Sequence, residues 1–190
     1  MRVIGGKYKG KKLFQPLDKT TRPIRDLVKE SIFNIIQHSK KINVQLENSR
    51  ILDLYAGSGS FGIECISRNA NLVCFFEKHL NAVKILNQNL NQLDKDLNYK
   101  IYNNDCLKLI SSENFIEKNF DIIFLDPPFK DTRINEILSL IAKKKILKNE
   151  GIIIIHRHIK DKLEILDKFH IIEDRRYGIS KIFFIKKFKF

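Results

Sequence analysis

The chain has 190 residues, of which 43% are hydrophobic, and this is enough for one domain with its own buried core. The amino terminus has no apolar signal segment and no apolar run approaches membrane-spanning length, so a cytoplasmic protein is expected. The three cysteines are odd in number and widely spaced, which argues against a disulfide framework or a zinc site and predicts reduced thiols.

The net charge of +13 is confined to the two ends of the chain. Residues 1–25 hold eight Lys or Arg and one acid, a net charge of +7, and residues 175–190 hold six Lys or Arg and no acid. The residues between these two segments are neutral overall. Charge concentrated in this way favours a polyanionic partner such as a nucleic acid, with a solvated lysine-rich surface as the alternative.

The first part of the chain predicts a basic arm and a helix. Residues 2–13 alternate glycines with basic residues around Tyr8, which is typical of a short hairpin or arm that can approach phosphates and stack on a base. A helix is predicted from Asp26 to about His38, because apolar residues recur at helical spacing. The polar residues 39–49 mark a boundary before the main domain.

A strand, a turn and a helix follow in the pattern of a nucleotide-binding unit. The apolar residues 51–55 run directly into a turn in which Gly57, Gly59 and Gly62 form G-x-G-x-x-G, and helical spacing begins at Ile63. Such glycines let the backbone approach a ligand beside the free amides of a helix amino end. The turn therefore predicts a nucleotide-type site, with a plain turn as the alternative.

Two further strand ends carry acids. The strand predicted at residues 72–77 ends in Glu77, where a carboxylate can accept hydrogen bonds from both hydroxyls of a ribose or can simply close the strand. A helix at residues 79–93 and a third strand at residues 99–103 follow. After that strand, Asp105 can accept from the exocyclic amine of an adenine or serve as a solvated loop acid.

The most informative stretch is the end of the fourth strand, at residues 121–125, which stops at Asp126-Pro127-Pro128-Phe129. Prolines do not continue a central strand, so Asp126 is expected at the carboxyl end, where open α/β sheets bind ligands. A carboxylate, carbonyl groups on a stiff turn and an aromatic ring together predict a holder for a flat heterocycle that carries an amine. A helix follows at residues 131–145.

The next strand is predicted at residues 152–155, which are apolar throughout, as in a strand covered on both faces. His156, Arg157 and His158 follow it. No acid or cysteine stands at a ligand spacing from these residues, so no metal site is predicted.

The last part of the chain predicts a helix at residues 159–166 and an antiparallel hairpin at residues 169–174 and 179–185. Together with the earlier elements, this predicts an α/β fold, with a mostly parallel sheet, helices on both faces and antiparallel strands at one edge. The glycine turn and the three acids all follow carboxyl ends of strands. We therefore expect them on one rim of the sheet.

Two cofactors fit this rim, and the glycine turn alone does not decide between them. A dinucleotide oxidoreductase uses the same glycines and an acid at the position of Glu77. Hydride transfer, however, gives no reason for Asp126-Pro127-Pro128-Phe129 or for basic chain ends, and the chain is short for two nucleotide-binding halves and a substrate domain. These features favour S-adenosyl-L-methionine as the cofactor.

The residues also resemble a known family. The run from Asp53 to Gly59 resembles the first motif of Rossmann-type methyltransferases, and the run from Asp126 to Phe129 resembles their amino-methylating motif. Nearly the whole chain resembles the bacterial 16S ribosomal RNA guanine-N2 methyltransferases. The stretches that carry this likeness are residues 2–6, 9–13, 21–23, 26–33 and 177–181.

The resemblance implies a class I methyltransferase fold with a mostly parallel seven-stranded sheet. It divides the chain into a basic RNA-binding appendage at residues 1–45 and an S-adenosyl-L-methionine-binding domain at residues 46–190. It implies methyl transfer to the exocyclic N2 amine of a guanine in 16S ribosomal RNA, free or in a small-subunit assembly particle, by a monomer without a metal ion.

The same resemblance assigns roles to individual residues. The catalytic residues that it implies are Asp126, Pro127, Pro128 and Phe129. The cofactor-binding residues are Asp53, Tyr55, Ala56, Gly57, Ser58, Gly59, Glu77, Asp105 and Cys106. The RNA-binding residues, which the charge distribution also favours, are Arg2, Lys7, Lys9, Lys11, Lys12, Arg22 and Arg25.

Two alternatives stay open at this point. The amino-methylating motif also serves adenine N6 and cytosine N4, so the chain can be a DNA amino-methyltransferase. A non-catalytic RNA-binding factor of ribosome assembly, with a vestigial Rossmann core, is the second alternative, and the intact motif from Asp126 to Phe129 argues against it.

Overall fold

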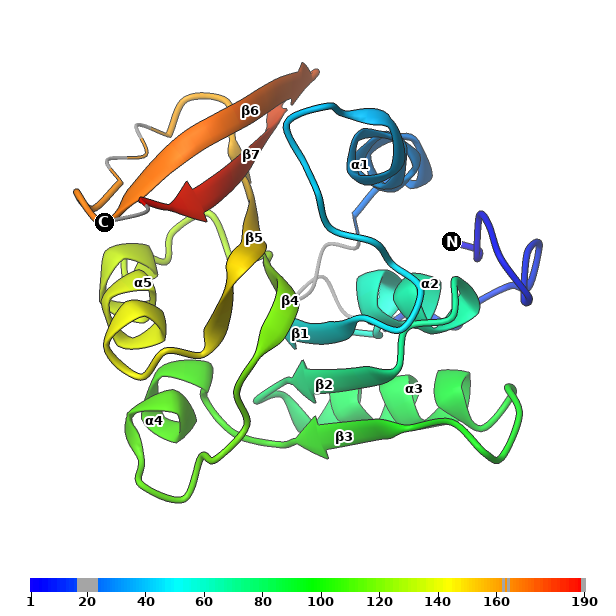
Figure 1. Ribbon diagram of the computed structural model, residues 1–190. Helices are drawn as coiled ribbons and strands as arrows, with labels where there is room; N and C mark the ends of the chain where they lie inside the picture. Colours follow the sequence, from blue (N-terminus) through cyan, green and yellow to red (C-terminus); the bar gives the residue numbers. More distant parts are fainter. Residues whose placement is uncertain (17–23, 162, 164, 189–190) are drawn as a thin grey trace.

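A computed structural model describes residues 1–16, 24–161, 163 and 165–188 (Figure 1). Its centre is a seven-stranded sheet in the order β3-β2-β1-β4-β5-β7-β6. Strands β1 to β5 pair in parallel, whereas β7 is antiparallel to both β5 and β6, as predicted. The strands are Arg50–Leu54 (β1), Leu72–Phe76 (β2), Tyr99–Tyr102 (β3), Phe120–Leu125 (β4), Leu147–His158 (β5), Phe169–Tyr177 (β6) and Ser180–Lys187 (β7).

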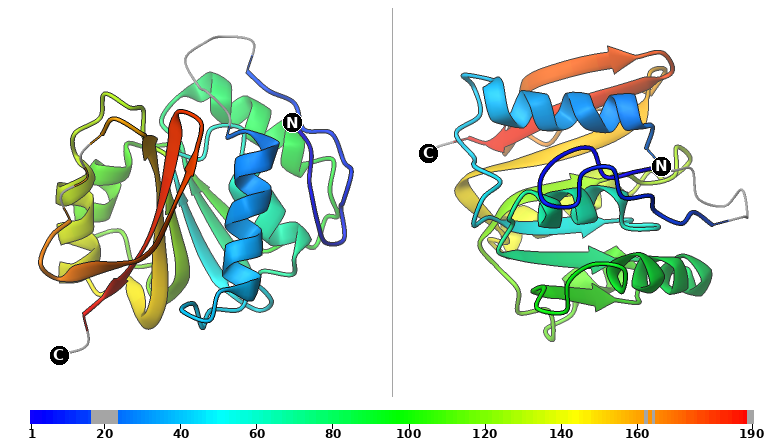
Figure 2. Two further views of the ribbon diagram at one scale, coloured as in Figure 1. Left: turned by 90° about the horizontal axis from the view of Figure 1, so that it is seen from above. Right: turned by 90° about the vertical axis from the view of Figure 1, so that its right-hand side faces the viewer.

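Helices cover both faces of the sheet (Figure 2). Helices α1, α2 and α3 lie on one face, and α4 and α5 lie on the other. None of the helices in the described ranges is both long and apolar enough to cross a membrane. The helices are Asp26–His38 (α1), Ser60–Ser67 (α2), Leu80–Leu90 (α3), Cys106–Ser111 (α4) and Ile134–Lys143 (α5).

Two hydrophobic clusters fill the space between the sheet and its helices. Successive residues of a strand point to opposite faces, so Ile122 and Phe124 join the first cluster and Ile123 and Leu125 join the second. All four side chains are at most 2% exposed. A strand buried on both faces explains why residues 121–125 are apolar apart from the first.

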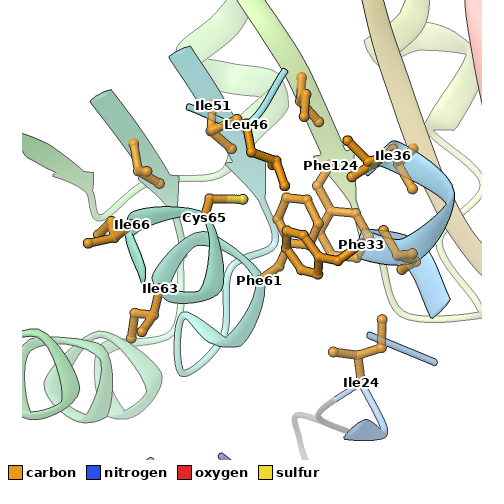
Figure 3. Packing of buried hydrophobic residues seen from close by; sticks show 14 of the residues in the cluster. Ile24, Phe33, Ile36, Leu46, Ile51, Phe61, Ile63, Cys65, Ile66 and Phe124 are labelled. Atoms are coloured by element: carbon orange, nitrogen blue, oxygen red, sulfur yellow. The ribbon is translucent and has the colours of Figure 1, made fainter. Parts of the chain in front are cut away.

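Three stacked rings tie α1 to the sheet (Figure 3). The centroid of Phe61 in α2 lies 5.2 Å from that of Phe33 in α1 and 4.1 Å from that of Phe124 in β4. Such pairs contribute about 0.5–1.5 kcal/mol each beyond the burial of their area. Val3, Leu13 and the buried residues of α1 therefore belong to the same hydrophobic cluster as α2, α3 and one face of the sheet. The division of the chain at residue 45 stays a prediction.

The helix predicted at residues 159–166 is wrong for the described residues of this stretch. The backbone N–H of Ile159 donates to the carbonyl of Ile179 at 2.8 Å, and Arg157 pairs with Asp161 at 2.9 Å. The first contact holds the segment against the β6–β7 turn, and the second ties it to the end of β5. Its apolar residues pack on the second cluster in an irregular conformation.

Helix α4 was not predicted. It is only six residues long, and Cys106 and Ile110 are its buried residues, so its periodicity is weak. Its start is nevertheless well defined, because the Asp105 carboxylate accepts from the N–H groups of Leu107 and Lys108.

The predicted hairpin at the amino terminus is confirmed, with an antiparallel bridge between Arg2 and Lys12. It is anchored on α2, where the Glu64 carboxylate accepts from the N–H groups of Ile4 at 2.7 Å and Gly5 at 2.8 Å. Two strand-like segments of the arm therefore lie along the helix rather than in the sheet.

A buried lysine completes this anchor. Lys29 is fully buried, and its Nζ donates to the Arg2 carbonyl at 2.7 Å and to Ser60 Oγ at 3.2 Å. Its Nζ also lies 3.7 Å from a Glu64 carboxylate oxygen. Burial lowers the pKa of Lys29, and the charge of Glu64 opposes this.

Phe14, at the end of the arm, is linked through Asn89 to Ser58, which stands just before α2. The Phe14 N–H donates to Asn89 Oδ1 at 2.7 Å, and Asn89 Nδ2 donates to the carbonyls of Phe14 at 3.1 Å and Ser58 at 2.9 Å. Asn89 is fully buried. One side chain of α3 thus joins the arm to the glycine turn.

We expect Glu64→Gln to lower the free energy of unfolding by about 3–5 kcal/mol, because it leaves the Lys29 charge buried without its partner. Urea denaturation followed by circular dichroism measures this change. The matched control is Glu47→Gln, an exposed acid, which is expected to change stability by less than about 0.5 kcal/mol. Equal stability of the two variants would show that this pair does not anchor the arm.

Candidate active site

A cavity of about 290 Å³ opens at the carboxyl ends of β1, β2 and β4. Ile24 and Arg25, which precede α1, and Ser180, which begins β7, also line it. The cavity collects every predicted catalytic residue and every predicted cofactor-binding residue except Gly59. These lining residues are Asp53, Tyr55, Ala56, Gly57, Ser58, Glu77, Asp105, Cys106, Asp126, Pro127, Pro128 and Phe129.

Glu77 holds the glycine turn. Its carboxylate accepts from the N–H of Gly57 and from the N–H of His79, both at 2.8 Å. Gly57 has a φ of 56°, and a Cβ added there would meet nothing within 4 Å. Gly59 has a φ of 83°, and its Cβ would lie 2.3 Å from Leu86 Cδ1. Gly57 thus borders open space, whereas Gly59 is packed against α3.

Asp53 supports the turn from inside the sheet. Its side chain is 1% exposed, and its Oδ2 accepts from the N–H of Gly62 at 3.0 Å. Burial raises the pKa of Asp53 well above its ordinary value. The Gly62 N–H opposes this shift, and the charges of Asp126 and Glu77 add to it. The acids of the cavity are therefore close enough to affect one another.

Arg133 joins two acids beside the cavity. Its guanidinium lies 3.1 Å from Asp105 Oδ2 and 2.7 Å from Asp131 Oδ2, and the Tyr55 hydroxyl donates to Asp131 at 3.1 Å. Burial raises the pKa of Asp131, but the hydrogen bonds from Arg133 outweigh it and bring this pKa to about 2. Burial raises the pKa of the Cys106 thiol to about 11, so this thiol is neutral. Hydrogen bonds and ion pairs thus link Tyr55, Asp105, Asp131 and Arg133 into one network.

The predicted catalytic acid has a partner that was not predicted for it. His156 Nδ1, at the end of β5, lies 2.7 Å from Asp126 Oδ1. The ring of Phe129 meets the ring of His156 edge to face, with centroids 5.9 Å apart, and meets that of His158 at 5.2 Å. The last residues of β5 thus contact both the acid and the aromatic residue that follow β4.

Arg157 fixes the backbone of the same loop. Its guanidinium donates to the carbonyl of Pro128 at 3.2 Å and to that of Phe129 at 2.8 Å, and it pairs with Asp161. Arg157 is only 6% exposed. No described residue donates a hydrogen bond to the Pro127 carbonyl. The loop therefore keeps one carbonyl acceptor unused.

These partners were missed because the sequence was searched for metal ligands at His156 and Arg157, and for no other role. The signal that was present is their position directly after an apolar strand, at the rim already assigned to Asp126. Arg133 and Asp131 gave no such signal. The contact between Arg133 and Asp105 joins two segments that no local pattern links.

The tip of the basic arm lies at the far end of α2 from the cavity. Lys7 pairs with Asp94, and Lys11 Nζ donates to the Gln92 carbonyl, whereas Lys9 is exposed. Since α2 has eight residues, its two ends are separated by about 12 Å. The cations of the tip are thus remote from Asp126.

The remaining cations predicted to bind RNA have different positions. Arg2 and Lys12 are exposed where the arm crosses α2, and Arg25 lines the cavity. Arg22 lies outside the described residues. Arg25 is thus the predicted RNA-binding residue, among those that the structure describes, that lines the same cavity as Asp126.

The three cysteines are buried and free. Among the residues that the structure describes, no group of three or more His, Cys, Asp or Glu side chains is arranged to hold a metal ion.

Comparison with known proteins gives one family. The family described as "Conserved hypothetical protein 95" matches residues 1–186. The chain is 33% identical over 188 residues to "Putative rRNA methyltransferase YlbH" of Bacillus subtilis (strain 168), covering 98% of this chain and 99% of the relative. It is 32% identical to "Ribosomal RNA small subunit methyltransferase D" of Buchnera aphidicola subsp. Baizongia pistaciae, covering 83% of this chain and 76% of the relative.

The fold is also similar to solved structures. One is "Putative methyltransferase yhhF from Escherichia coli", with a TM-score of 0.84 and 24% identity, covering 98% of this chain and 97% of the other. At this identity the likeness concerns the fold. It confirms the predicted fold, a mostly parallel α/β sheet with antiparallel strands at one edge.

The two glycines of the turn give a test of the cavity. We expect Gly57→Ala to fold with a loss of about 1–2 kcal/mol, the cost of a left-handed residue, and to bind S-adenosyl-L-methionine at least about tenfold more weakly. Gly59→Ala is expected to lose more stability, because its Cβ meets Leu86. Urea denaturation and isothermal titration calorimetry measure the two effects. Wild-type affinity in folded Gly57→Ala would place the cofactor elsewhere.

Proposed function

Because the chain belongs to the family described as "Conserved hypothetical protein 95", we propose that it transfers a methyl group from S-adenosyl-L-methionine to the N2 amine of a guanine in 16S ribosomal RNA. Relatives named as methyltransferases of ribosomal RNA or of its small subunit support the substrate. The observation that carries the proposal is the position of Asp126, Pro127 and Phe129 on the cavity that Gly57 and Glu77 also line.

The residues of the cavity fit the proposed cofactor. Gly57 leaves open space beside the turn, and each oxygen of Glu77 that accepts one N–H can accept a further hydrogen bond, as from a ribose hydroxyl. Asp105 is the candidate partner of the adenine amine. When bound, S-adenosyl-L-methionine supplies a methyl group on a positively charged sulfur, and the Glu77 carboxylate, which lines the cavity, favours that charge.

The loop after β4 is suited to an exocyclic amine. The lone pair of such an amine is delocalised into the ring, so orientation matters more than a strong base. Asp126 Oδ2 and the Pro127 carbonyl are acceptors with no donor among the described residues, and we assign one amine hydrogen to each. Held in this way, the amine would present its nitrogen lone pair to a methyl group supplied by the bound cofactor, whose sulfur would keep the electron pair of the methyl–sulfur bond, and Asp126 would take the surplus proton of the methylated amine.

Phe129 is assigned to stack on the guanine, an interaction that contributes about 1–3 kcal/mol per base. A guanine inside a helix cannot reach the cavity, so the substrate is proposed to be an unpaired nucleotide of free RNA or of an assembling subunit. We also propose that the protein acts as a monomer in the cytoplasm.

Exposed cations line the cavity or stand near its lining residues in the sequence. Arg25 and Lys78 line it, Lys130 follows Phe129 directly, and Lys160 lies beside His158. A fifth cation, Arg176, stands next to the turn that leads to β7. None of them forms an ion pair with a described residue, whereas Lys7 at the arm tip does. We assign the phosphate contacts around the target nucleotide to these cations.

We expect the wild type to transfer tritiated methyl groups from S-adenosyl-L-methionine to small-subunit RNA or its precursor particles, and Asp126→Ala to transfer them at least about 100-fold more slowly. Digestion of the product to nucleosides should give N2-methylguanosine. Calorimetry should show nearly unchanged cofactor binding by Asp126→Ala.

If the labelled methyl group were instead found on adenine or cytosine of DNA, the protein would be a DNA amino-methyltransferase, and the proposed RNA substrate would be wrong. RNA binding without any transfer by the wild type would favour the non-catalytic assembly factor. Wild-type turnover in Asp126→Ala would remove the role of this acid and leave the reaction in place.

We expect Arg25→Gln to weaken the binding of 16S ribosomal RNA and to reduce the slope of log K against log salt by about 1, because one phosphate contact is lost. Filter binding at several salt concentrations measures the slope. The control is Lys118→Gln, an exposed cation just before β4 and thus at the opposite edge of the sheet. A larger effect from Lys9→Gln would move the RNA-binding surface to the arm tip.

A further inference from the structure

The contact between His156 and Asp126 is largely buried. His156 is 7% exposed, its Nδ1 lies 2.7 Å from Asp126 Oδ1, and its Nε2 is buried without a hydrogen-bond partner. A carboxylate only accepts hydrogen bonds, so Nδ1 carries the hydrogen and donates it. A proton on Nε2 would be a buried donor without an acceptor, so the neutral Nδ1–H form is the one that this site favours.

Two other roles for His156 fit the structure poorly. One such role is that of a metal ligand. The acid that contacts the His156 ring is Asp126, and the described residues offer no group of three ligands for a metal ion. A general base needs an accessible nitrogen near the substrate. Nε2 is buried and Nδ1 is occupied by Asp126.

The contact also selects which oxygen of Asp126 is available. Oδ1 is engaged by His156, whereas Oδ2 has no donor among the described residues, and the Asp126 side chain is 19% exposed at the cavity. The edge of the same imidazole packs on the ring of Phe129. One side chain of β5 therefore orients both the acid and the ring of the loop that follows β4.

We propose, on the basis of the function proposed above, that His156 is a positioning residue that fixes Asp126 through Oδ1 and leaves Oδ2 to accept from the substrate amine. It acts through Asp126 and does not itself touch the substrate. Its neutral N–H orients the carboxylate without cancelling the negative charge that faces the amine. Loss of this donor leaves Asp126 free to rotate away from the amine.

The test compares His156→Leu, which has no donor, with His156→Asn, whose amide can donate from nearly the position of Nδ1. We expect His156→Leu to lower kcat about tenfold, which corresponds to about 1.4 kcal/mol, with little change in the KM for RNA or in cofactor affinity. His156→Asn should recover most of this loss. The control is His38→Leu, at the exposed end of α1, which should have wild-type kcat.

A second measurement needs neither cofactor nor RNA. In 15N-labelled protein, NMR should show an exchange-protected imidazole N–H resonance that His156→Leu lacks and that Asp126→Ala shifts or loses. Urea denaturation establishes that each variant is folded.

Absence of the resonance from the wild type overturns the hydrogen bond. The positioning role alone is overturned if the wild type is active and His156→Leu has the same kcat. It is also overturned if His156→Asn is folded but has a kcat as low as that of His156→Leu. A wild type that shows the resonance but methylates no RNA overturns the proposed function, and the positioning role falls with it.

Discussion

The parallel pairing of β1 with β4 is the constraint on which the site depends. These strands are neighbours in the sheet, although β2, β3 and their helices separate them in the chain. Leu54 therefore stands beside Leu125, and the glycine turn that follows one meets Asp126, which follows the other. The strand order reverses at this pair, which is where open α/β sheets leave a crevice. A slip of one residue would turn every side chain of β4 to the opposite face.

Charge is arranged in two zones around this crevice. Asp53, Glu77 and Asp126 lie inside it, and their mutual repulsion contributes to the raised pKa of Asp53. The exposed cations line it or stand near its lining residues in the sequence, and salt and water screen them from the acids. The proposed reaction needs both zones, because its cofactor carries a positive charge and its RNA substrate is a polyanion. Arg25 and Lys78 are residues at which the two zones meet, since both line the cavity and are exposed.

Local patterns predicted the sheet and the position of Asp126, because strand periods and turn residues are recorded in neighbouring positions of the sequence. The helix predicted at residues 159–166 had suitable spacing, but a backbone contact with Ile179 prevails over it. The contacts of His156 and Arg157 with the loop after β4 were not predicted, although the position of both residues at the rim could be seen in the sequence. His156 and Arg157 contact a loop that lies about 30 residues earlier, and only the order of the strands brings them together.

The amino-terminal arm has a consequence for the synthesis of the chain. Its anchors are made late, since Ile4 binds Glu64 and Phe14 binds Asn89, which is 75 residues further on. At about 5–20 residues per second, translation reaches that asparagine roughly 4–15 s after Phe14. Until then the arm has nothing to dock on and its backbone groups remain hydrated. The residues made first are thus among the last to reach their places, and the centre of the sequence has to form the surface that receives its beginning.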